Sequence, residues 1–372
     1  MSSTGEPSCD AEARRDTPLA LKLKKQIKGD GPIAADEYMR ACLQDAEHGY
    51  YRNKSAIGGA GDFITAPEIT QVFGEIIGAW VAVTWQQMGA PERLRLVELG
   101  PGRGTLMSDI TRVLRRVPPL ASALSIELLE TSEPLREQQQ AILADCGFPV
   151  AWPAAIEPRE GLATILIANE FLDCLAPISW VKGADRWARR LVTVDDMGRL
   201  QFATEFMPSA GKHIALRFPD AAEGSVYEEM PSEGFATGLA RIAGRSPLVA
   251  LLLDYGSRDD GLGDTLQAVR QHAYEHPLAS PGEADLTCHV KFSWYREDIE
   301  AEGLAVDGPV TQAEFLGALG LVQRASKLMS ANPEIAHDIE AGVARIMAVP
   351  GMGDRFKVLG ARSAGLPPLA GL

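Results

Sequence analysis

The residues with the clearest chemical potential lie in one short segment, LVELGPGRGT, which runs from Leu96 to Thr105. Glu98 is followed by three glycines at two-residue spacing, Gly100, Gly102 and Gly104. Glycine lets a ligand lie against bare backbone, because no Cβ stands in the way. A dinucleotide fingerprint would need its third glycine at position 105, which is Thr. The segment therefore predicts a nucleoside-type cofactor, with Glu98 and the three glycines as its contacts.

The pattern E-x-G-x-G-x-G resembles the first motif of class I S-adenosylmethionine-dependent methyltransferases. In that class the glycines let the methionine part of the cofactor approach the chain, and an acid at the end of the next strand binds the ribose hydroxyls. The next apolar run here, ALSIELLETS, ends at Glu130, roughly at the interval expected of nucleotide-binding folds. Glu127 is the competing acid, but it lies inside the apolar run. The resemblance therefore implies that Glu130 is the ribose ligand.

A third set of polar residues, Asn169, Glu170 and Asp173, follows the apolar run ATILI. The carboxyl ends of parallel strands face one crevice in an open α/β sheet, so we expect these side chains near the glycines. Methyl transfer needs an acceptor held in line with the methyl group, and a carboxylate can bind a guanidinium through two parallel hydrogen bonds. We therefore interpret the three residues as catalytic, with Glu170 foremost. The alternative is that Asp or Asn only caps the following helix.

The segment GDFITAPEIT, Gly61 to Thr70, carries Asp62, Thr65 and Glu68 in a glycine-rich loop. Loops often carry binding residues, so these three side chains are candidates for closing over the cofactor or holding the substrate. The alternative is that Pro67 and Glu68 merely open the next helix, with Thr65 as its cap.

Apolar periodicity predicts the elements that must position these residues. Buried strands are expected at Leu94–Leu99 and Leu248–Asp254, and a long amphipathic helix at Ile69–Met88. The segment WARRLVTVDDMGRLQFATEF alternates and has a turn signature at Asp195–Gly198, which predicts a β-hairpin. Helical spacing runs from Pro18 to Gln44.

The order of these elements predicts an α/β fold with an N-terminal helical extension and an inserted β-rich segment. The resemblance to class I methyltransferases implies that its sheet is Rossmann-like, with helices on both faces. We expect five segments along the chain: a disordered N-terminus (1–18), a helical segment with a glycine-rich loop (19–90), the first part of the core (91–177), the β-rich insertion (178–245), and the second part of the core with accessory elements (246–372).

Composition restricts the function classes. The 372 residues carry a formal net charge of −14 at pH 7, which argues against a general nucleic-acid binder. No apolar stretch reaches the roughly 18 residues needed to span a bilayer, so we expect no membrane insertion. The five cysteines are scattered and never in C-x-x-C spacing, and no H-E-x-x-H motif surrounds the histidines, so we expect no disulfide framework and no metal site.

The N-terminal segment Met1–Pro18 contains four acidic residues and no apolar core of a signal peptide. This composition predicts a cytoplasmic protein of bacterial type. If the source is eukaryotic, we expect the mitochondrial matrix, although no transit peptide is evident.

Motifs through most of the chain, from about Leu19 to Leu359, resemble the MidA-like family of class I methyltransferases. The matching segments are HGYY (48–51), GDFITAPEITQVFGE (61–75), VELGPGRGTLMSDI (from 97), LLETSEPLREQQ, ANEFLD (from 168), LLLDYG (from 251), LQAVRQH, PGEADLTCHV, TQAEFLGALG and MGDRFKVL. The family's mitochondrial member is a complex I assembly factor that methylates an arginine of a core peripheral-arm subunit. The resemblance therefore implies a protein arginine methyltransferase giving dimethylarginine, with S-adenosyl-L-methionine as cofactor and a core peripheral-arm subunit of respiratory complex I as protein substrate.

Two positions depart from the family pattern. Ala176 separates Leu175 from Pro177 in the family's N-E-F-F-D-A-L-P stretch, and Lys291 stands where the family usually has Asp. Two other functions remain as hypotheses. One is a non-catalytic complex I assembly chaperone that retains a pocket for S-adenosylmethionine, and the other is a nicotinamide-dependent oxidoreductase, which Thr105 disfavours.

Overall fold

A mixed sheet of eight strands forms the centre of the computed structural model, which describes residues 14–53, 65–207, 211–230 and 234–372. Five neighbouring strands run parallel, and the last two along the sheet are antiparallel to their neighbours. The strand order is β4 (Val150–Ala151), β3 (Leu124–Leu129), β2 (Leu94–Leu99), β5 (Ala163–Asn169), β10 (Leu248–Ser257), β16 (Phe356–Arg362) and β15 (Ala305–Thr311), with β14 (Val290–Lys291) paired to the end of β10.

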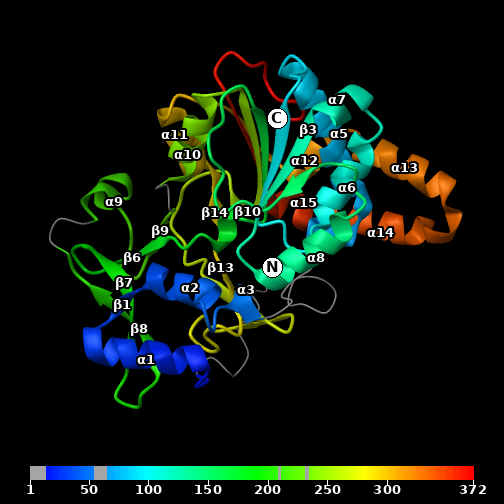
Figure 1. Ribbon diagram of the computed structural model, residues 1–372. Coiled ribbons are helices and arrows are strands. Elements are labelled where there is room, and N and C mark those ends of the chain that lie inside the picture. The colour runs from blue at the N-terminus through cyan, green and yellow to red at the C-terminus, as the bar shows by residue number, and fades with distance from the viewer. Residues whose placement is uncertain (1–13, 54–64, 208–210, 231–233) are drawn as a thin grey trace.

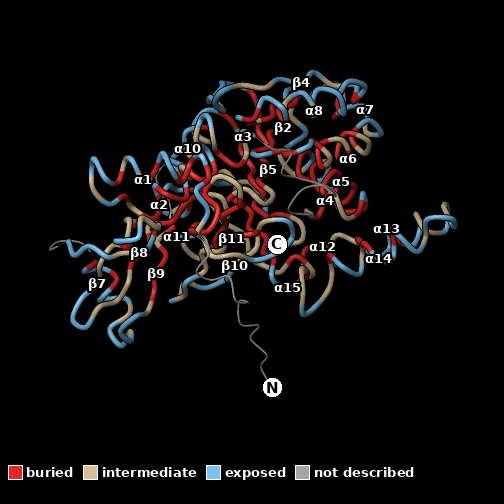
Figure 2. Tube along the Cα trace, turned by 90° about the horizontal axis from the view of Figure 1, so that it is seen from below, coloured by how far each residue is buried: buried red, intermediate tan, exposed pale blue. Residues whose placement is uncertain are grey.

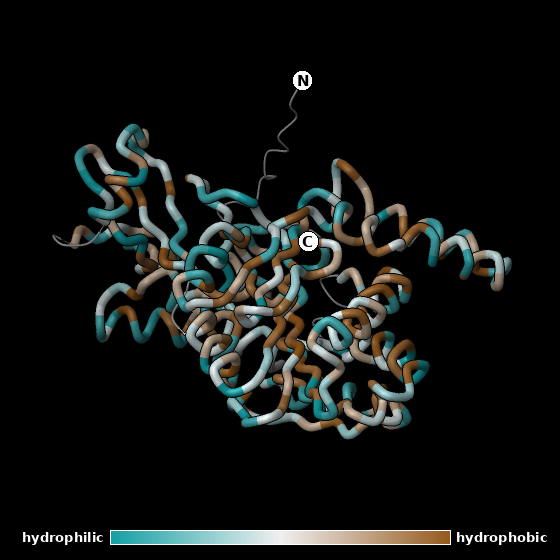
Figure 3. The backbone as a smooth tube through the Cα atoms, turned by 90° about the horizontal axis from the view of Figure 1, so that it is seen from above, coloured by the Kyte–Doolittle hydropathy of each residue, from teal (hydrophilic) through white to brown (hydrophobic). Residues whose placement is uncertain are grey.

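Apolar side chains on both faces of these strands explain why the sheet is buried. In β2, Leu96 packs into the hydrophobic cluster on one face, and Val97 packs into the cluster on the other. Ile165 and Leu166 divide in the same way in β5. Strands of this kind require helices on both sides. Hydrophobic residues accordingly gather at the centre of the molecule, whereas the outer ends of its projecting parts are mostly hydrophilic (Figure 3).

Helices cover both faces of the sheet, as the sequence predicts (Figure 1). The residues of one cluster come from helices that include α5 (Gln71–Gln87), α6 (Thr105–Leu114), α12 (Gln312–Ala318), α13 (Leu321–Ala331) and α14 (Ala336–Met347). The other cluster includes residues of α10 (Phe235–Ala243) and α11 (Phe292–Ala301). The helices α7 (Pro118–Ala123), α8 (Glu133–Leu143) and α15 (Met352–Arg355) complete this part, and α13 and α14 project from its side (Figure 2).

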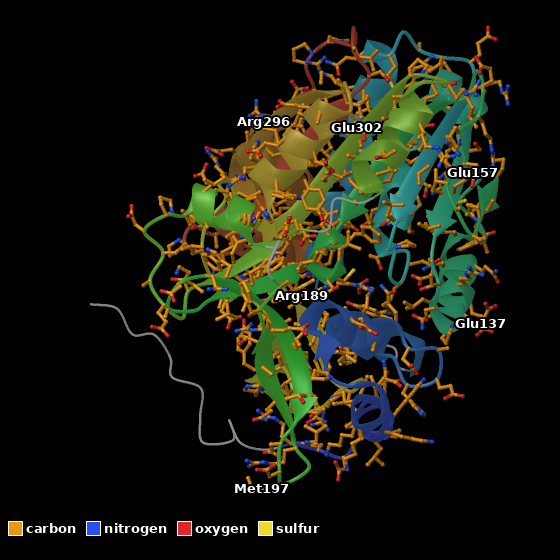
Figure 4. All side chains as sticks on the ribbon, turned by 90° about the vertical axis from the view of Figure 1, so that its left-hand side faces the viewer. Glu137, Glu157, Arg189, Met197, Arg296 and Glu302 are labelled. Carbon is orange, nitrogen blue, oxygen red and sulfur yellow. The ribbon has the colours of Figure 1, made fainter. Side chains whose placement is uncertain are left out.

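A second, smaller lobe lies beside the core. Its antiparallel sheet contains β1 (Ile33–Ala34), β6 (Ile178–Lys182), β7 (Trp187–Val194), β8 (Leu200–Glu205) and β9 (Val226–Glu229), accompanied by the short helix α9 (Lys212–Arg217). The predicted hairpin is confirmed, because β7 and β8 pair and Gly198 closes the turn at φ +77°. Figure 4 shows Met197 at the tip of this hairpin.

The helical pattern of Pro18–Gln44 forms two helices, and the second begins beside Asp36 and Glu37, as their place before an apolar run predicts; the short strand between the helices was not predicted. Gly31, at φ +95°, ends α1 (Pro18–Asp30), and β1 then pairs with β7 before α2 (Ala35–Gln44) begins. The N-terminus therefore joins the inserted strands, and Arg189 of β7 binds Asp36 of α2 at 2.9 Å (Figure 4).

The helix predicted at Ile69–Met88 is also interrupted. Thr70, in an extended conformation, separates α4 (Ala66–Ile69) from α5, and its hydroxyl accepts a hydrogen bond from the backbone of Val72. Thr70 is thus the cap of the long helix, whereas Thr65 begins α4 without a side-chain cap. The five-segment division of the chain stays a prediction. Residues 1–13 of the expected disordered N-terminus lie outside the described residues, and Pro18 already belongs to α1.

A three-stranded sheet of β11 (Gln267–Arg270), β12 (Ala273–Glu275) and β13 (Asp285–Thr287), together with α3 (Tyr50–Asn53), lies near the carboxyl end of β10. In the described part of the chain, no helix is long and apolar enough to cross a membrane.

The position of the site follows from the strand order. The chain continues from β2 to β3 and β4 on one side, then returns to β5 and β10 on the other. In open α/β sheets, ligands bind where the order reverses, outside the carboxyl ends of the strands. Here those ends are Leu99 of β2 and Asn169 of β5, which lead directly into two of the predicted functional segments.

Candidate active site

One pocket lies at this reversal point, and residues of three predicted groups line it. They come from the glycine turn after β2, from the end of β5 and from α4. The lining residues are Thr65, Pro67, Glu68, Glu98, Gly100, Pro101, Gly102, Arg103, Thr105, Leu106, Asn169 and Glu170. The structure thus brings together cofactor, catalytic and substrate candidates that are far apart in the sequence. Gly104, Glu130 and Asp173 are not among the lining residues.

The glycine turn adopts a backbone that few other residues tolerate. Gly100, Gly102 and Gly104 have φ values of +60°, +53° and +83°. A Cβ on Gly100 would lie 3.0 Å from the ring of Phe171, so this glycine allows the segment after β5 to pack against the turn. The turn therefore serves packing within the protein as well as leaving backbone exposed to a ligand.

Glu98 is a buried carboxylate without a complete set of partners. It is 3% exposed, and its Oε2 atom has no hydrogen-bond partner among the described residues. Burial, and then the negative charge of Glu130, raise the pKa of Glu98 to about 8. An unpaired buried carboxylate is costly unless a ligand completes its contacts. Glu98 is therefore suited to receive a donor or a cation in the pocket.

Glu130 follows β3 and lies beside the glycine turn. Its Oε1 atom accepts a hydrogen bond from the backbone of Ser132 at 2.7 Å, and its Oε2 atom accepts one from Nε2 of Gln139 at 3.3 Å. The same Nε2 donates to the carbonyl of Gly102 at 2.7 Å. Burial raises the pKa of Glu130 despite these hydrogen bonds.

The amide of Gln139 therefore connects Glu130 to the glycine turn, a role the sequence analysis missed. Gln139 is 0% exposed, and its Oε1 accepts a hydrogen bond from the indole of Trp152 at 2.7 Å. One signal was available in the sequence. Gln139 lies four residues from both Leu135 and Leu143, on the buried face of α8, where a polar residue needs a specific partner.

Glu127, the competing acid, is paired with two arginines. Its carboxylate binds Arg95 at 3.0 Å and Arg159 at 2.8 Å. Arg95 belongs to β2, which pairs with β3 on one side and β5 on the other, and it is completely buried. Arg95 also donates to the hydroxyl of Thr164 at 3.0 Å. These ion pairs account for Glu127 without a ligand.

Glu170 enters the pocket from the end of β5 with a backbone φ of +51°, in the left-handed region. Its Oε1 atom accepts hydrogen bonds from the backbone of Ala66 at 3.2 Å and from the side chain of Asn169 at 3.4 Å. No described group donates to its Oε2 atom. Burial raises the pKa of Glu170 to about 7, and the charge of Asp173 acts in the same direction. Among the described residues, Oε2 is thus the oxygen of Glu170 left for a substrate to contact.

Asn169 and Asp173 have different surroundings. Asn169 lines the pocket and orients Glu170. Asp173 instead accepts a hydrogen bond from the hydroxyl of Thr287 at 2.8 Å, on the side of the small sheet. Burial raises the pKa of Asp173. The structure thus places Asp173 behind Glu170 rather than in the pocket.

Two of the three predicted substrate residues, Thr65 and Glu68, line the pocket beside the glycine turn. Glu68 of α4 binds the hydroxyl of Thr105, and its other oxygen lies 3.3 Å from the guanidinium of Arg103. Glu68 therefore joins α4 to the glycine turn. Asp62, the third, lies outside the described residues.

Lys291 and Ala176, the two residues that depart from the family pattern, are both buried. Lys291 is 5% exposed, and its ammonium group lies 3.2 Å from Asp260 and 4.0 Å from the ring centroid of Tyr227. This position therefore holds a buried ion pair. Ala176, also buried, packs in the hydrophobic cluster on the α10 face of the sheet. Among the described residues, no group of acids, cysteines and histidines is arranged to hold a metal ion.

Comparison with known proteins agrees with the geometry. Residues 76–310 match the family model of S-adenosyl-L-methionine-dependent methyltransferases. The chain is 32% identical to the mitochondrial protein arginine methyltransferase NDUFAF7 of Mus musculus, across 95% of this chain and 86% of that protein. It is also 32% identical to the mitochondrial homolog of Drosophila melanogaster, across 95% and 86%. A solved structure from Burkholderia thailandensis, bound to S-adenosyl-homocysteine, is similar with a TM-score of 0.81 and 26% identity, covering 96% of this chain and 97% of that one.

Proposed function

The chain belongs to the family of S-adenosyl-L-methionine-dependent methyltransferases, and from this premise we propose that it methylates an arginine side chain of a protein. The observation that carries the proposal is the position of Glu170 in the same pocket as the glycine turn. The mouse and fly relatives are named protein arginine methyltransferases, which supports this acceptor.

The residues of the pocket fit the cofactor. The glycine turn leaves backbone exposed, and the unpaired Oε2 of Glu98 can accept a hydrogen bond from a cationic ligand. Gly100 and Gly102 line the pocket and, with Gly104 of the same turn, would hold the methionine part. Glu130 does not line the pocket but is joined to the turn through Gln139, and it would hold the ribose. When bound, S-adenosyl-L-methionine supplies a methyl group on a positively charged sulfur, which makes the methyl carbon open to attack by a nitrogen lone pair.

Glu170 would bind and orient the arginine. A carboxylate offers a planar guanidinium two acceptors, and its charge offsets that of the cation. The transfer forms one N–C bond, breaks one C–S bond and releases one proton from the guanidinium nitrogen. In the pocket, Oε2 of Glu170 would accept that proton from the nitrogen it contacts and pass it to solvent, while Asn169 and the backbone of Ala66 hold Oε1 in place.

We also propose an identity for the acceptor protein and a cellular compartment for the reaction. The MidA-like resemblance supports a core peripheral-arm subunit of respiratory complex I. The mouse and fly relatives are named mitochondrial proteins, which supports an acceptor of the respiratory system. For a bacterial source, the cytoplasm remains our prediction.

The deciding experiment compares the wild type with Glu170→Gln. Gln keeps the shape of the side chain but loses the charge, so cofactor binding should be normal while methyl incorporation into the complex I subunit is largely lost. Full activity of the variant would contradict the role of Glu170. If the wild type binds the cofactor and the subunit without any methyl transfer, the non-catalytic chaperone is the better description.

A further inference from the structure

Asp254, at the carboxyl end of β10, holds the backbone of the segment that carries Glu170. Its Oδ2 atom accepts hydrogen bonds from the backbone N–H groups of Leu172 at 2.8 Å and Asp173 at 3.2 Å. Its Oδ1 atom accepts one from its own neighbour, Tyr255, at 2.9 Å. The side chain of Asp254 is 0% exposed, so water does not compete for these bonds.

The neighbouring residue of β10 completes the attachment. The backbone N–H of Glu170 donates to the carbonyl of Leu253 at 2.8 Å. Three N–H groups of the segment 170–173 are therefore fixed by two consecutive residues of one strand. Glu170 has φ +51°, a left-handed conformation that is unfavourable for residues other than glycine. Several fixed contacts in the surrounding structure are needed to hold such a conformation.

The other side of the segment is fixed by the glycine turn. The ring of Phe171 lies against Gly100 so closely that a Cβ there would be 3.0 Å away. The segment is thus held between the cofactor turn and β10, and the carboxylate of Glu170 is aimed by this backbone rather than by neighbours of its own side chain alone.

Asp254 has no cationic partner among the described residues. Its contacts are backbone N–H groups, and the negative charges of Asp173 and Glu170 add to the burial that raises its pKa. Burying a carboxyl group next to other acids lowers the stability of the folded protein. A hydrophobic residue of similar size would avoid this loss, so the acceptor oxygens of Asp254 are expected to have a role.

We propose that Asp254 is a positioning residue for arginine methylation, which sets the conformation of residues 170–173 and thereby directs Glu170 at the acceptor. The inference rests on the proposed role of Glu170. Asp254 does not touch the acceptor or the cofactor; it acts through the backbone of the Glu170 segment.

The test uses the full chain and the variants Asp254→Ala and Asp254→Asn. Ala removes both acceptor oxygens, whereas the amide oxygen of Asn can still accept from Leu172 and Asp173. With Ala, we expect faster amide hydrogen exchange in residues 169–175, unchanged affinity for S-adenosyl-homocysteine, and at least a tenfold lower kcat/KM for the complex I subunit. Asn should restore most of the exchange protection and of the activity.

A double-mutant cycle separates positioning from general stability. If Asp254 acts through Glu170, then Asp254→Ala should cause no further loss of activity in a Glu170→Gln background. Asp307→Ala is the control for general stability, because Asp307 of β15 accepts a backbone hydrogen bond from Leu369 and pairs with Arg362, far along the sheet from the pocket. It should lower the melting temperature and leave acceptor kinetics unchanged.

Several results would overturn the inference. The first is a loss of cofactor affinity in Asp254→Ala as large as its loss of kcat/KM. The second is that the effects of Asp254→Ala and Glu170→Gln on activity multiply in the double mutant. The third is unchanged amide exchange in residues 169–175. If Asp254→Ala does not fold, the decision falls to Asp254→Asn, where an undisturbed kcat/KM together with altered exchange would contradict positioning. If the wild type does not methylate the subunit, the proposed function fails, and hydrogen exchange still decides whether Asp254 holds the segment.

Discussion

Glu98 and Glu130 lie at the carboxyl ends of two adjacent parallel strands, and the charge of Glu130 adds to the burial that raises the pKa of Glu98 to about 8. Glu98 therefore binds a proton near neutral pH in the protein without cofactor. A cation that enters the pocket favours the ionised form and lowers this pKa. Cofactor binding should accordingly be linked to release of a proton from Glu98.

This linkage predicts the direction of the pH dependence. Below pH 8 the binding of S-adenosyl-L-methionine must displace the proton, so affinity should rise with pH, by at most about tenfold between pH 7 and pH 9, and then level off. Calorimetric titration in buffers of different ionisation enthalpy measures the proton released. Glu98→Gln should remove the proton release and the rise of affinity that come from Glu98. The cofactor's own amino group titrates in both proteins, so the test compares the pH profile of the variant with that of the wild type. Identical pH profiles would contradict the assignment.

The glycine turn gives a second prediction. Gly102→Val should abolish cofactor binding, because a β-branched side chain disfavours φ +53° and would occupy the pocket proposed for the cofactor. Circular dichroism should show an intact fold. Gly198→Val is the control for strain alone, since Gly198 also has positive φ, at a hairpin turn with open space around its Cα. Unchanged affinity in Gly102→Val would exclude this turn as the cofactor site.

A third prediction concerns the ribose. Glu130→Ala removes charge-assisted hydrogen bonds worth roughly 1.5–3 kcal/mol, so cofactor affinity should fall about ten- to a hundredfold. Glu127→Ala is the matched control on the same strand. Because Glu127 pairs with Arg95 and Arg159, its loss should lower the melting temperature while leaving affinity unchanged. A larger loss of affinity in Glu127→Ala would show that the wrong acid is assigned to the ribose.

The sequence was most informative about features set by local patterns. Apolar runs such as Leu94–Leu99 specify buried parallel strands, and the order of these strands places Gly102 and Glu170 at one crevice. The hairpin at Gly198 followed from the alternating pattern of its two strands and from the turn residues between them. These features depend on periodicity and on backbone conformation, which a short window of sequence contains.

The remaining features depend on partners that are remote in the sequence. The two-residue strand β1 has no periodicity of its own, and its pairing with β7 exists only because the two segments meet in the fold. Glu68 is a plausible helix-opening residue in the sequence, yet its carboxylate binds Thr105 and Arg103 of the glycine turn. The sequence places Gln139 on a buried helix face and Asp254 at the end of a buried strand, but what each holds follows only from its backbone partners, Gly102 and Leu172.

A fourth prediction links the function of Glu170 to a cost in stability. Its pKa is about 7 in the folded protein, raised from the ordinary value of 4.5 for a glutamate, so the folded state binds the proton more tightly than the unfolded state. Below about pH 4.5 both states are protonated and Glu170 has no effect on the free energy of unfolding. As pH rises to 7, the unfolded state ionises first and the stability of the wild type falls. Above pH 7 the penalty is complete.

Glu170→Gln should therefore be more stable than the wild type at pH 8, by an increase in Tm on the order of 2 °C, and the difference should vanish near pH 4. The Gln side chain retains an oxygen that can accept from Ala66 and Asn169, so the hydrogen bonds of Oε1 should survive. Thermal unfolding followed by circular dichroism from pH 4 to pH 8 measures the effect in both proteins. A variant that is stabilised at neutral pH but inactive would show that the carboxylate is kept for its chemistry. A stability gain independent of pH would mean that the ionisation of Glu170 is not its source.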